Sequence, residues 1–216
     1  MPEKKEIAHG AYLLPEITKN IAPGTIKTII ELGGGNGLDS IALSQHYFGS
    51  KVYCFECNPE SIYKCEEYLK NTEITLIKKA VSDIDGIIDF YPNTDGRYLT
   101  SAIYKAVDNY PEKLEQGKIK VKSTRLDTWM KGNKIEQVDL ICADIQGAFL
   151  KAMKGMGDYI YKVKYIIAEI ETKPIYQGED LFDETYKYLA DHGFILIDSR
   201  KETDYFGDYI FVNIKL

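Results

Sequence analysis

The stretch Thr25–Gly37, TIKTIIELGGGNG, decides the fold that this sequence predicts. Its first part, Thr25–Gly34, is an apolar run that ends at glycines, as a buried strand does, and Gly37–Phe48 carries apolar residues at helical spacing. Glycines at such a corner let the backbone turn tightly and admit a ligand close to the chain, because no Cβ intervenes. The stretch therefore predicts a strand, a glycine loop and a helix, with a ligand bound beyond the end of the strand.

The rest of the chain continues this alternation of strands and helices. Short apolar runs predict further strands at residues 51–56, 74–82, 138–145, 165–170, 194–199 and 209–216. Helices are predicted at residues 58–71, 149–153 and 180–193, the first of them capped by Asn58 and Pro59 and the last closed by Gly193. Strands separated by helices indicate an α/β fold with a doubly wound, seven-stranded, mostly parallel sheet. The last strand follows its neighbour without a helix, so we expect it to run antiparallel.

The chain is predicted to form one domain, residues 1–216. Its length fits a single domain that buries a large core without a disulfide or a structural metal. Residues 1–24 are expected to form an N-terminal helical segment. Residues 89–122 include a polar, tyrosine-rich stretch with no regular pattern, and we expect this insert to cover the substrate site, because functional loops are usually mounted beyond strand ends.

The amino-acid composition indicates which partners and which cellular location to expect. The 33 acidic residues outnumber the 27 basic ones, which disfavours nucleic acid as a partner. No apolar run reaches the ~20 residues of a membrane span, and the N-terminus lacks the pattern of a signal peptide, so a cytoplasmic protein without a membrane partner is expected. Cys54 and Cys57 have C-x-x-C spacing, but no second pair follows. We therefore interpret the cysteines as structural thiols and predict no metal site.

The glycine loop itself discriminates between cofactors. A dinucleotide fingerprint requires a glycine or alanine where this chain has Leu38, whereas the pattern from Glu31 to Gly37, E-x-G-x-G-x-G, is the signature of class I S-adenosylmethionine-dependent methyltransferases. Glu56 ends the second strand, where a carboxylate can accept hydrogen bonds from both ribose hydroxyls. NAD-binding folds also place an acid there, so Glu56 does not discriminate alone. Asp39, in the first turn of the following helix, is expected to be structural.

Four segments resemble the FkbM-type methyltransferases, a class I family that typically methylates hydroxyl oxygens on sugars or secondary metabolites. These segments are IIELGGGNGLDS, CFECNPES, AVSDIDGIIDFY, and RLDTWM followed by VDLICADIQGAFLKAMKG. Together they lie between Ile29 and about Glu171, roughly two-thirds of the chain. One position departs from the family pattern, since Phe149 stands where an acid usually follows Gly-Ala.

The resemblance implies an S-adenosylmethionine site. Its eight residues would be Glu31, Gly33, Gly35, Gly37, Glu56, Asn58, Ala80 and Val81. In it the glycines contact the methionine end, Glu31 orients the amino group directly or through water, and Glu56 holds the ribose. Ala80 and Val81 flank the adenine. Asn58 either assists Glu56 or serves only as the helix N-cap.

Asp144, at the end of the strand 138–145, is the candidate acceptor-side residue. It would act as the general base for an acceptor hydroxyl or as a ligand for a metal that binds the acceptor; alternatively it only caps the next helix. The sequence thus predicts an S-adenosylmethionine-dependent O-methyltransferase acting on a sugar, a glycan or a small metabolite. An NAD-dependent oxidoreductase and a non-catalytic S-adenosylmethionine-binding protein are the alternatives.

Overall fold

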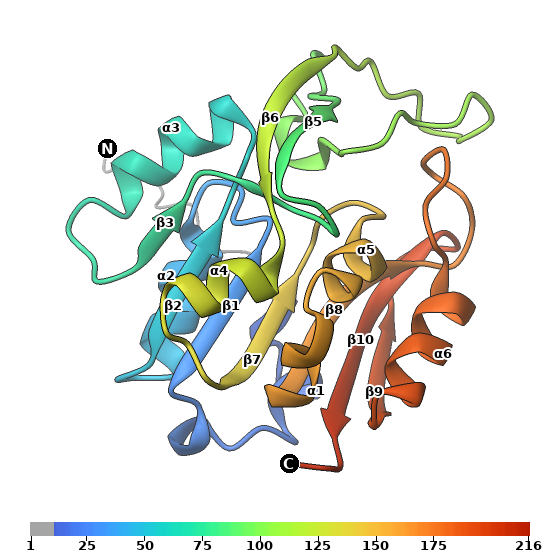
Figure 1. Cartoon of the computed structure of the whole chain (residues 1–216). Coiled ribbons are helices and arrows are strands. Elements are labelled where there is room, and N and C mark those ends of the chain that lie inside the picture. Colours follow the sequence, from blue (N-terminus) through green and yellow to red (C-terminus); the bar gives the residue numbers. More distant parts are fainter. Residues whose placement is uncertain (1–10) are drawn as a thin grey trace.

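The apolar runs of the sequence pair into one seven-stranded sheet in the computed structural model, which describes residues 11–216 (Figure 1). Its strands, in spatial order, are β3 (Thr75–Ile77), β2 (Lys51–Phe55), β1 (Thr28–Leu32), β7 (Val138–Ala143), β8 (Val163–Glu171), β10 (Phe206–Asn213) and β9 (Phe194–Lys201). Neighbouring strands are parallel except β10, which runs antiparallel to both β8 and β9. The predicted fold class, including the antiparallel last strand, is confirmed.

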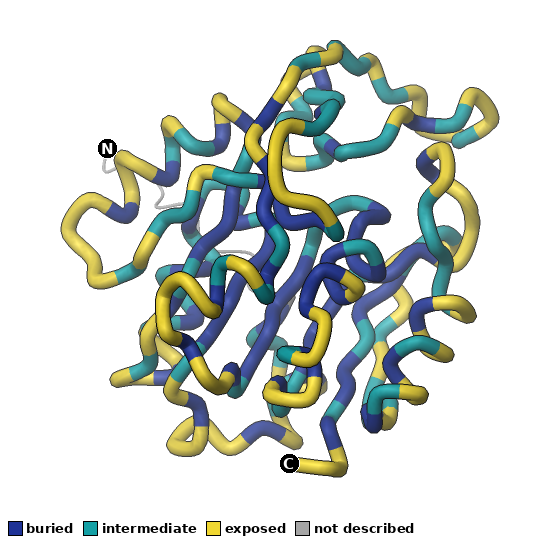
Figure 2. The backbone as a smooth tube through the Cα atoms, viewed as in Figure 1, coloured by how far each residue is buried: buried dark blue, intermediate teal, exposed yellow. Residues whose placement is uncertain are grey.

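Helices cover both faces of this sheet because alternate strand residues point to opposite sides. One face carries α1 (Pro15–Thr18), α2 (Leu38–His46) and α3 (Pro59–Tyr68), and the other carries α4 (Leu126–Gly132), α5 (Phe149–Lys154) and α6 (Phe182–Asp191). Ile29 packs with the first group and Ile30 with the second, and both are fully buried. The central strands are accordingly the dark core of the tube in Figure 2.

Local signals set the ends of two helices as predicted. The Asn58 Oδ1 accepts a hydrogen bond from the Glu60 N–H at 3.2 Å, and Pro59 is the first residue of α3. Gly193 follows α6 with a φ of +94°, a conformation that glycine adopts without strain. These caps hold the helices in the register that their apolar faces require.

The strand predicted at Ile74–Ser82 is wrong in one respect: it is two strands in two sheets. β3 joins the main sheet, whereas β4 (Ala80–Val81) pairs with β6 (Ile119–Thr124), which also pairs with β5 (Gly86–Phe90). The break falls at Lys78 and Lys79, where the Lys79 N–H donates to the Ile77 carbonyl at 2.9 Å and turns the chain sharply. The two lysines lie between β3, which is partly exposed, and β4, whose two residues are buried.

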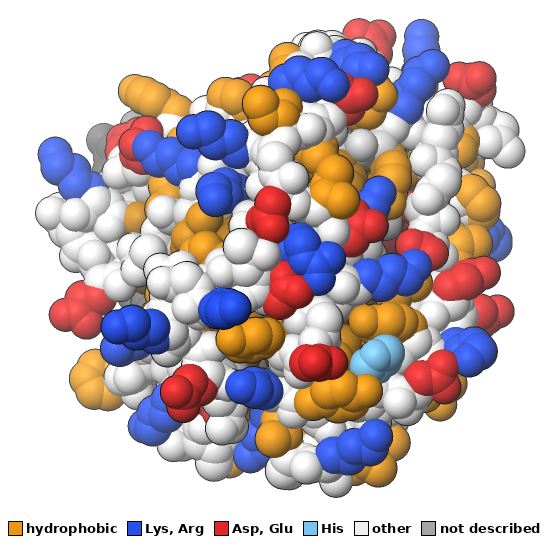
Figure 3. Space-filling model, in the orientation of Figure 1, with side chains coloured by type: hydrophobic (Ala, Val, Ile, Leu, Met, Phe, Trp, Pro, Cys, Tyr) orange, Lys and Arg blue, Asp and Glu red, His pale blue; other side chains and the backbone are white. Residues whose placement is uncertain are grey.

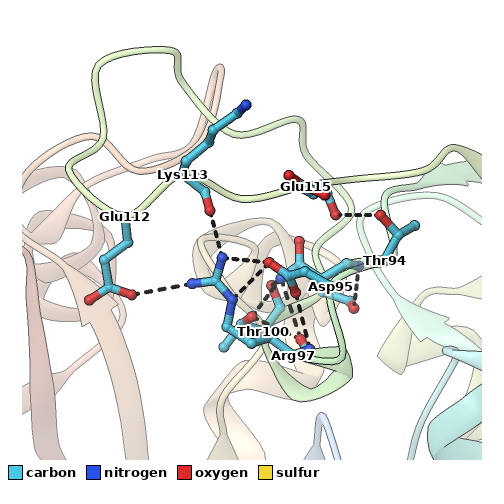
Figure 4. A network of polar contacts seen from close by, with 9 residues as sticks. Thr94, Asp95, Arg97, Thr100, Glu112, Lys113 and Glu115 are labelled. Atoms are coloured by element: carbon cyan, nitrogen blue, oxygen red, sulfur yellow. Dashed lines mark hydrogen bonds and ion pairs between the residues drawn. The ribbon is translucent and has the colours of Figure 1, made fainter.

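The insert lies between β5 and β6, at the top of Figure 1. Its one regular element is a 3-10 helix, η3 (Tyr98–Thr100), and the remainder is held by polar contacts and by a small apolar cluster that includes Ala102 and Ala106. Figure 4 shows the Arg97 guanidinium contacting the carboxylates of Asp95 and Glu112 and the carbonyl oxygen of Lys113. Side chains that close the loop on itself explain why the sequence pattern in this region is irregular.

The N-terminal segment is helical only in short pieces. These are η1 (Ala11–Leu13), α1 and η2 (Pro23–Thr25), and the first ten residues of the predicted segment lie outside the described residues. A further 3-10 helix, η4 (Gly157–Lys162), leads into β8. Among residues 11–216, no helix has the length and apolarity needed to cross a membrane.

The strand order indicates where a ligand site is expected. The chain leaves β1 for β2 and β3 on one side and returns at β7 on the other, so the carboxyl ends of β1 and β7 lie at the point where the order reverses. In open α/β sheets this is the place where ligands bind.

Candidate cofactor and acceptor site

A cavity opens at the carboxyl ends of β1, β2 and β7, with an empty volume of about 850 Å³ that is partly open to solvent. Seven of the nine predicted site residues line it: Gly33, Gly35, Glu56, Asn58, Ala80, Val81 and Asp144.

The glycine loop lines this cavity and has no room for a Cβ at three positions, one of which is Gly34, where a Cβ would overlap the Cys54 Sγ. Gly33 has a φ of +83°, and a Cβ there would overlap the carbonyl oxygen of Asp144. Gly35 has a φ of +55°, and a Cβ there would lie 2.8 Å from the Leu99 side chain. The N–H groups of Gly33 and Gly34 both donate to the Phe55 carbonyl, at 3.0 and 2.9 Å. The loop is thus wedged between the ends of β2 and β7.

Glu56 follows β2 and is held by backbone groups. Its Oε1 accepts from the N–H groups of Cys57 and Asn58 at 2.6 and 2.7 Å, and its Oε2 accepts from the Gly35 N–H at 2.8 Å. Burial raises the pKa of Glu56 to about 7, and these three hydrogen bonds oppose that rise. A carboxylate has about four acceptor positions, so hydroxyl groups of a ligand can still bind there.

Glu31 and Gly37 are not among the residues that line the cavity. Glu31 is buried beneath the loop, where its Oε2 accepts from the Ser40 hydroxyl and its Oε1 has no hydrogen-bond partner within residues 11–216. Burial raises the pKa of Glu31 to about 8. Gly37 is the N-cap of α2, where a Cβ would press against Leu69. A direct contact of either residue with a cofactor stays a prediction.

Asn58 makes contacts beyond the two predicted roles, which were to assist Glu56 or to cap the helix. Besides capping α3, its Nδ2 donates to the Tyr98 carbonyl at 3.1 Å and to the Ser101 hydroxyl at 3.3 Å. Both partners belong to the insert, so Asn58 ties the rim of the cavity to the segment that covers it. No signal in the sequence connects residues so far apart.

An apolar wall stands opposite the glycine loop. Ala80 and Val81 share it with Phe90 and Ile103, and Phe90 is itself buried in the small sheet. An apolar surface of this kind suits an aromatic ring such as adenine.

Asp144 follows β7 on the far side of the glycine loop from Glu56. Its Oδ1 accepts a hydrogen bond from the Gln146 Nε2 at 2.6 Å. Burial raises its pKa, whereas the hydrogen bonds from Gln146 and Glu169 lower it. The N-cap of α5 is Ala148, with no side-chain cap, so the alternative that Asp144 caps this helix is wrong.

The charged residues that line the cavity are mostly acidic. Among the described residues they are Asp39, Glu56, Asp144 and Lys79. Asp39, expected to be structural, therefore also faces the site. Within residues 11–216, no group of three or more His, Cys, Asp or Glu is arranged to hold a metal ion.

Phe149, which replaces the acid usual at this position of the family pattern, is the first residue of α5 and is buried in the main core. It does not line the cavity. The side chain therefore stabilises the packing of α5 against the sheet.

The strand order, with a glycine loop and two carboxylates at the switch point, defines the fold of class I methyltransferases. Residues 33–196, more than half of the chain, match the methyltransferase FkbM domain family. The protein belongs to this family.

Known proteins agree with this assignment. The 2-O-methyltransferase NoeI of Sinorhizobium fredii (strain NBRC 101917 / NGR234) is 29% identical over 160 residues, which cover 70% of this chain and 66%, just under two thirds, of NoeI. The methyltransferase FkbM from Methylobacillus flagellatus KT has a similar fold, with a TM-score of 0.57 at 14% identity over 86% of this chain and 43% of that one. Aeropyrum pernix fibrillarin, solved with natively bound S-adenosyl-L-methionine, also has a similar fold. Its TM-score is 0.50 at 12% identity, over 86% of this chain and 66% of the fibrillarin chain.

Proposed function

We propose that this protein transfers a methyl group from S-adenosylmethionine to a hydroxyl oxygen of a sugar, a glycan or a small metabolite. The observation that carries the proposal is the single cavity in which the glycine loop separates the Glu56 carboxylate from the Asp144 carboxylate. Membership of the FkbM family and the similarity to a 2-O-methyltransferase support the reaction and the acceptor class.

The lining of the cavity fits the cofactor. Glu56 would accept hydrogen bonds from the ribose hydroxyls, and the wall formed by Ala80 and Val81 would hold the adenine. Gly33 and Gly35 line the cavity with backbone alone, and their close packing against Asp144 and Leu99 leaves no room for a Cβ. When bound, S-adenosylmethionine supplies an electrophilic methyl group on a positively charged sulfur.

The charges of the lining favour this cofactor over NAD. Three carboxylates and one lysine surround the space, which suits a cationic sulfonium and disfavours a pyrophosphate with two negative charges. Asp39 lies in the first turn of α2, where a dinucleotide fold would receive the pyrophosphate. An NAD-dependent oxidoreductase is therefore the weaker hypothesis.

Asp144 is proposed to be the general base. Burial raises its pKa and so makes it a stronger base than an exposed carboxylate. As the acceptor oxygen bonds to the methyl carbon and the carbon–sulfur bond breaks, the hydroxyl proton moves to a carboxylate oxygen of Asp144. The products are a methyl ether and S-adenosylhomocysteine. Much of the remaining rate enhancement would come from alignment of the two reactants.

The insert is proposed to cover the acceptor. Tyr98, Leu99, Ser101 and Ile103 all line the cavity, whereas Tyr104 and Tyr110 pack in a small cluster at the side. In the described part of the N-terminal segment, Tyr12 is buried in the core that includes α1 and α2, and its hydroxyl interacts with the charge of Asp144. Within the proposed single domain, the region 89–122 would select the substrate, because it supplies these four lining residues.

Charge supports the proposal that nucleic acid is not a partner. The chain carries a net charge of −6, and on the face shown in Figure 3 basic side chains are interspersed with acidic ones. We also propose a cytoplasmic location without a membrane partner, in keeping with four free cysteines.

The test is methyl transfer from radiolabelled S-adenosylmethionine to a panel of glycans and polyols. We expect a methyl ether on at least one acceptor with the wild type, and formation of that ether about 10²–10⁴-fold slower with Asp144→Asn. Binding of S-adenosylmethionine without transfer to any acceptor would favour the non-catalytic protein, and hydride transfer to NAD would favour the oxidoreductase.

A further inference from the structure

Gln146 has an unusual backbone conformation beside the proposed base. Among residues 11–216, it and Lys134 are the two non-glycine residues with a left-handed φ, +50° and +56°. Glycine adopts this conformation without strain, and a residue with a Cβ does not. The strained turn directs the Gln146 side chain back toward the carboxyl ends of β7 and β8.

The side-chain amide of Gln146 there makes three hydrogen bonds. Its Nε2 donates to the Asp144 Oδ1 at 2.6 Å and to the Glu169 Oε1 at 3.1 Å, while its Oε1 accepts from the Tyr176 hydroxyl at 2.7 Å. An ionised carboxylate only accepts hydrogen bonds, so the amide must present its NH₂ group to Asp144. The Tyr176 hydroxyl, by donating to the other end, fixes that orientation.

Tyr176 is in turn held by the insert. It is buried in a small cluster with Ala102, Ala106 and Ile175, and Ala106 forms a backbone bridge with it. The Val107 N–H donates to the Ile175 carbonyl at 2.8 Å. The position of the hydroxyl therefore depends on how the insert packs against the segment that follows β8.

We infer that Gln146 and Tyr176 are positioning residues, which orient the Asp144 carboxylate toward the acceptor and couple it to the docked insert. The inference rests on the proposed role of Asp144 as the base. Neither residue lines the cavity, so both act through Asp144.

The surroundings of Asp144 show why it needs such donors. Six ionisable groups from the strands and loops around it interact with its charge, and each is neutral or negative: Tyr12, Glu56, Glu169, Glu171, Tyr176 and Asp208. None of these six supplies a positive charge that would keep Asp144 ionised. Burial, and next the Asp144 charge, raise the pKa of Glu169 well above its usual range. Hydrogen bonds from Gln146 and Glu169 lower the pKa of Asp144 and so oppose the effect of its burial.

The experiment compares Gln146→Gly and Tyr176→Phe with the control Lys134→Gly. Glycine relieves backbone strain at both positions, so Gln146→Gly is expected to fold while losing only the amide contacts. Lys134 is exposed and lies between α4 and β7, at the end of β7 opposite to Asp144, so its replacement removes the same strain without touching Asp144.

Two readouts are measured for each variant. One is the pH dependence of kcat/KM for methyl transfer, and the other is the titration of the Asp144 carboxyl carbon by NMR, assigned by its absence in Asp144→Asn. We expect Gln146→Gly to move the kcat/KM profile and the Asp144 titration to higher pH by about one unit, because a lost hydrogen bond to the charged form raises a carboxyl pKa. Tyr176→Phe should move the profile and the titration by less, and Lys134→Gly should leave both unchanged.

The outcomes separate the inference from the proposed function. An Asp144 titration unchanged in both Gln146→Gly and Tyr176→Phe would overturn the inference. A titration that moves while the kcat/KM profile stays fixed would support the contact and overturn the role of Asp144 as the base.

Discussion

Two of the three carboxylates that line the cavity, Glu56 and Asp144, follow strands on either side of β1 but are held in different ways. Three backbone N–H groups from adjacent loops hold Glu56. Asp144 is held by a side-chain amide, whose own orientation depends on a tyrosine from another loop. The cofactor side is thus fixed by backbone geometry, and the acceptor side by side chains that depend on the packing of the insert.

The largest effect expected from this difference is on catalysis. Asp144→Asn keeps an oxygen that can accept from Gln146 but cannot take a proton, so turnover should fall by about 10²–10⁴-fold. The affinity for S-adenosylmethionine, measured by calorimetry, should stay largely intact. Unchanged turnover would remove Asp144 from the mechanism.

Gly33 contacts the ends of both β2 and β7, through the Phe55 and Asp144 carbonyl groups. Gly33→Ala should therefore disturb both the cofactor side and the acceptor side of the cavity. Gly49 is a matched control, because its φ of +82° is almost the same and a Cβ there meets nothing within 4 Å. Gly49→Ala should lower the free energy of unfolding by about 1–2 kcal/mol through strain alone. Gly33→Ala adds the overlap with the Asp144 carbonyl, so we expect a larger loss in urea unfolding and no cofactor binding. Equal effects of the two substitutions would contradict the packing described.

Glu56→Gln should affect binding more than turnover, the reverse of Asp144→Asn. Loss of a charged hydrogen-bond acceptor costs about 1.5–3 kcal/mol, which corresponds to roughly a tenfold to hundredfold weaker affinity for S-adenosylmethionine. Calorimetric titration measures it. If Glu56→Gln left the affinity for S-adenosylmethionine unchanged and abolished turnover at saturating cofactor, Glu56 would be the base and the roles of Glu56 and Asp144 would have to be exchanged.

The smallest effect concerns stability and pH. Burial raises the pKa of Glu31 and Glu171 to about 8 and that of Glu56 to about 7, so the folded protein binds more protons than the unfolded chain above the ordinary carboxyl pKa. The contribution of these groups to the free energy of unfolding should therefore be greatest near pH 4–5 and should decrease as the pH rises to about 8.

Glu31→Gln removes one of these groups and should flatten that decrease, with a gain on the order of 1–3 kcal/mol at the alkaline end. The exposed Glu136→Gln is the control. Urea unfolding of the ligand-free protein at several pH values measures both, and a stability that rises with pH over this range would refute the assignment.

The difference between the Glu56 side and the Asp144 side also explains which parts of the site could be predicted from the sequence. The glycine loop and Glu56 belong to short contiguous segments, and their strand–loop–helix geometry follows from local rules. Glu169 and Tyr176 reach Gln146 from 23 and 30 residues away, through strand pairing and the docking of the insert. No periodicity indicates such contacts. The division of Ile74–Ser82 between two sheets has a similar cause, because the partner strand β6 lies about 40 residues further along the chain.

The most direct test of the central claim, that this cavity holds S-adenosylmethionine, is a calorimetric titration of the wild-type protein with S-adenosylmethionine and, separately, with NAD. We predict saturable binding of one S-adenosylmethionine per chain and no detectable heat with NAD. Binding of NAD with none of S-adenosylmethionine would contradict the account.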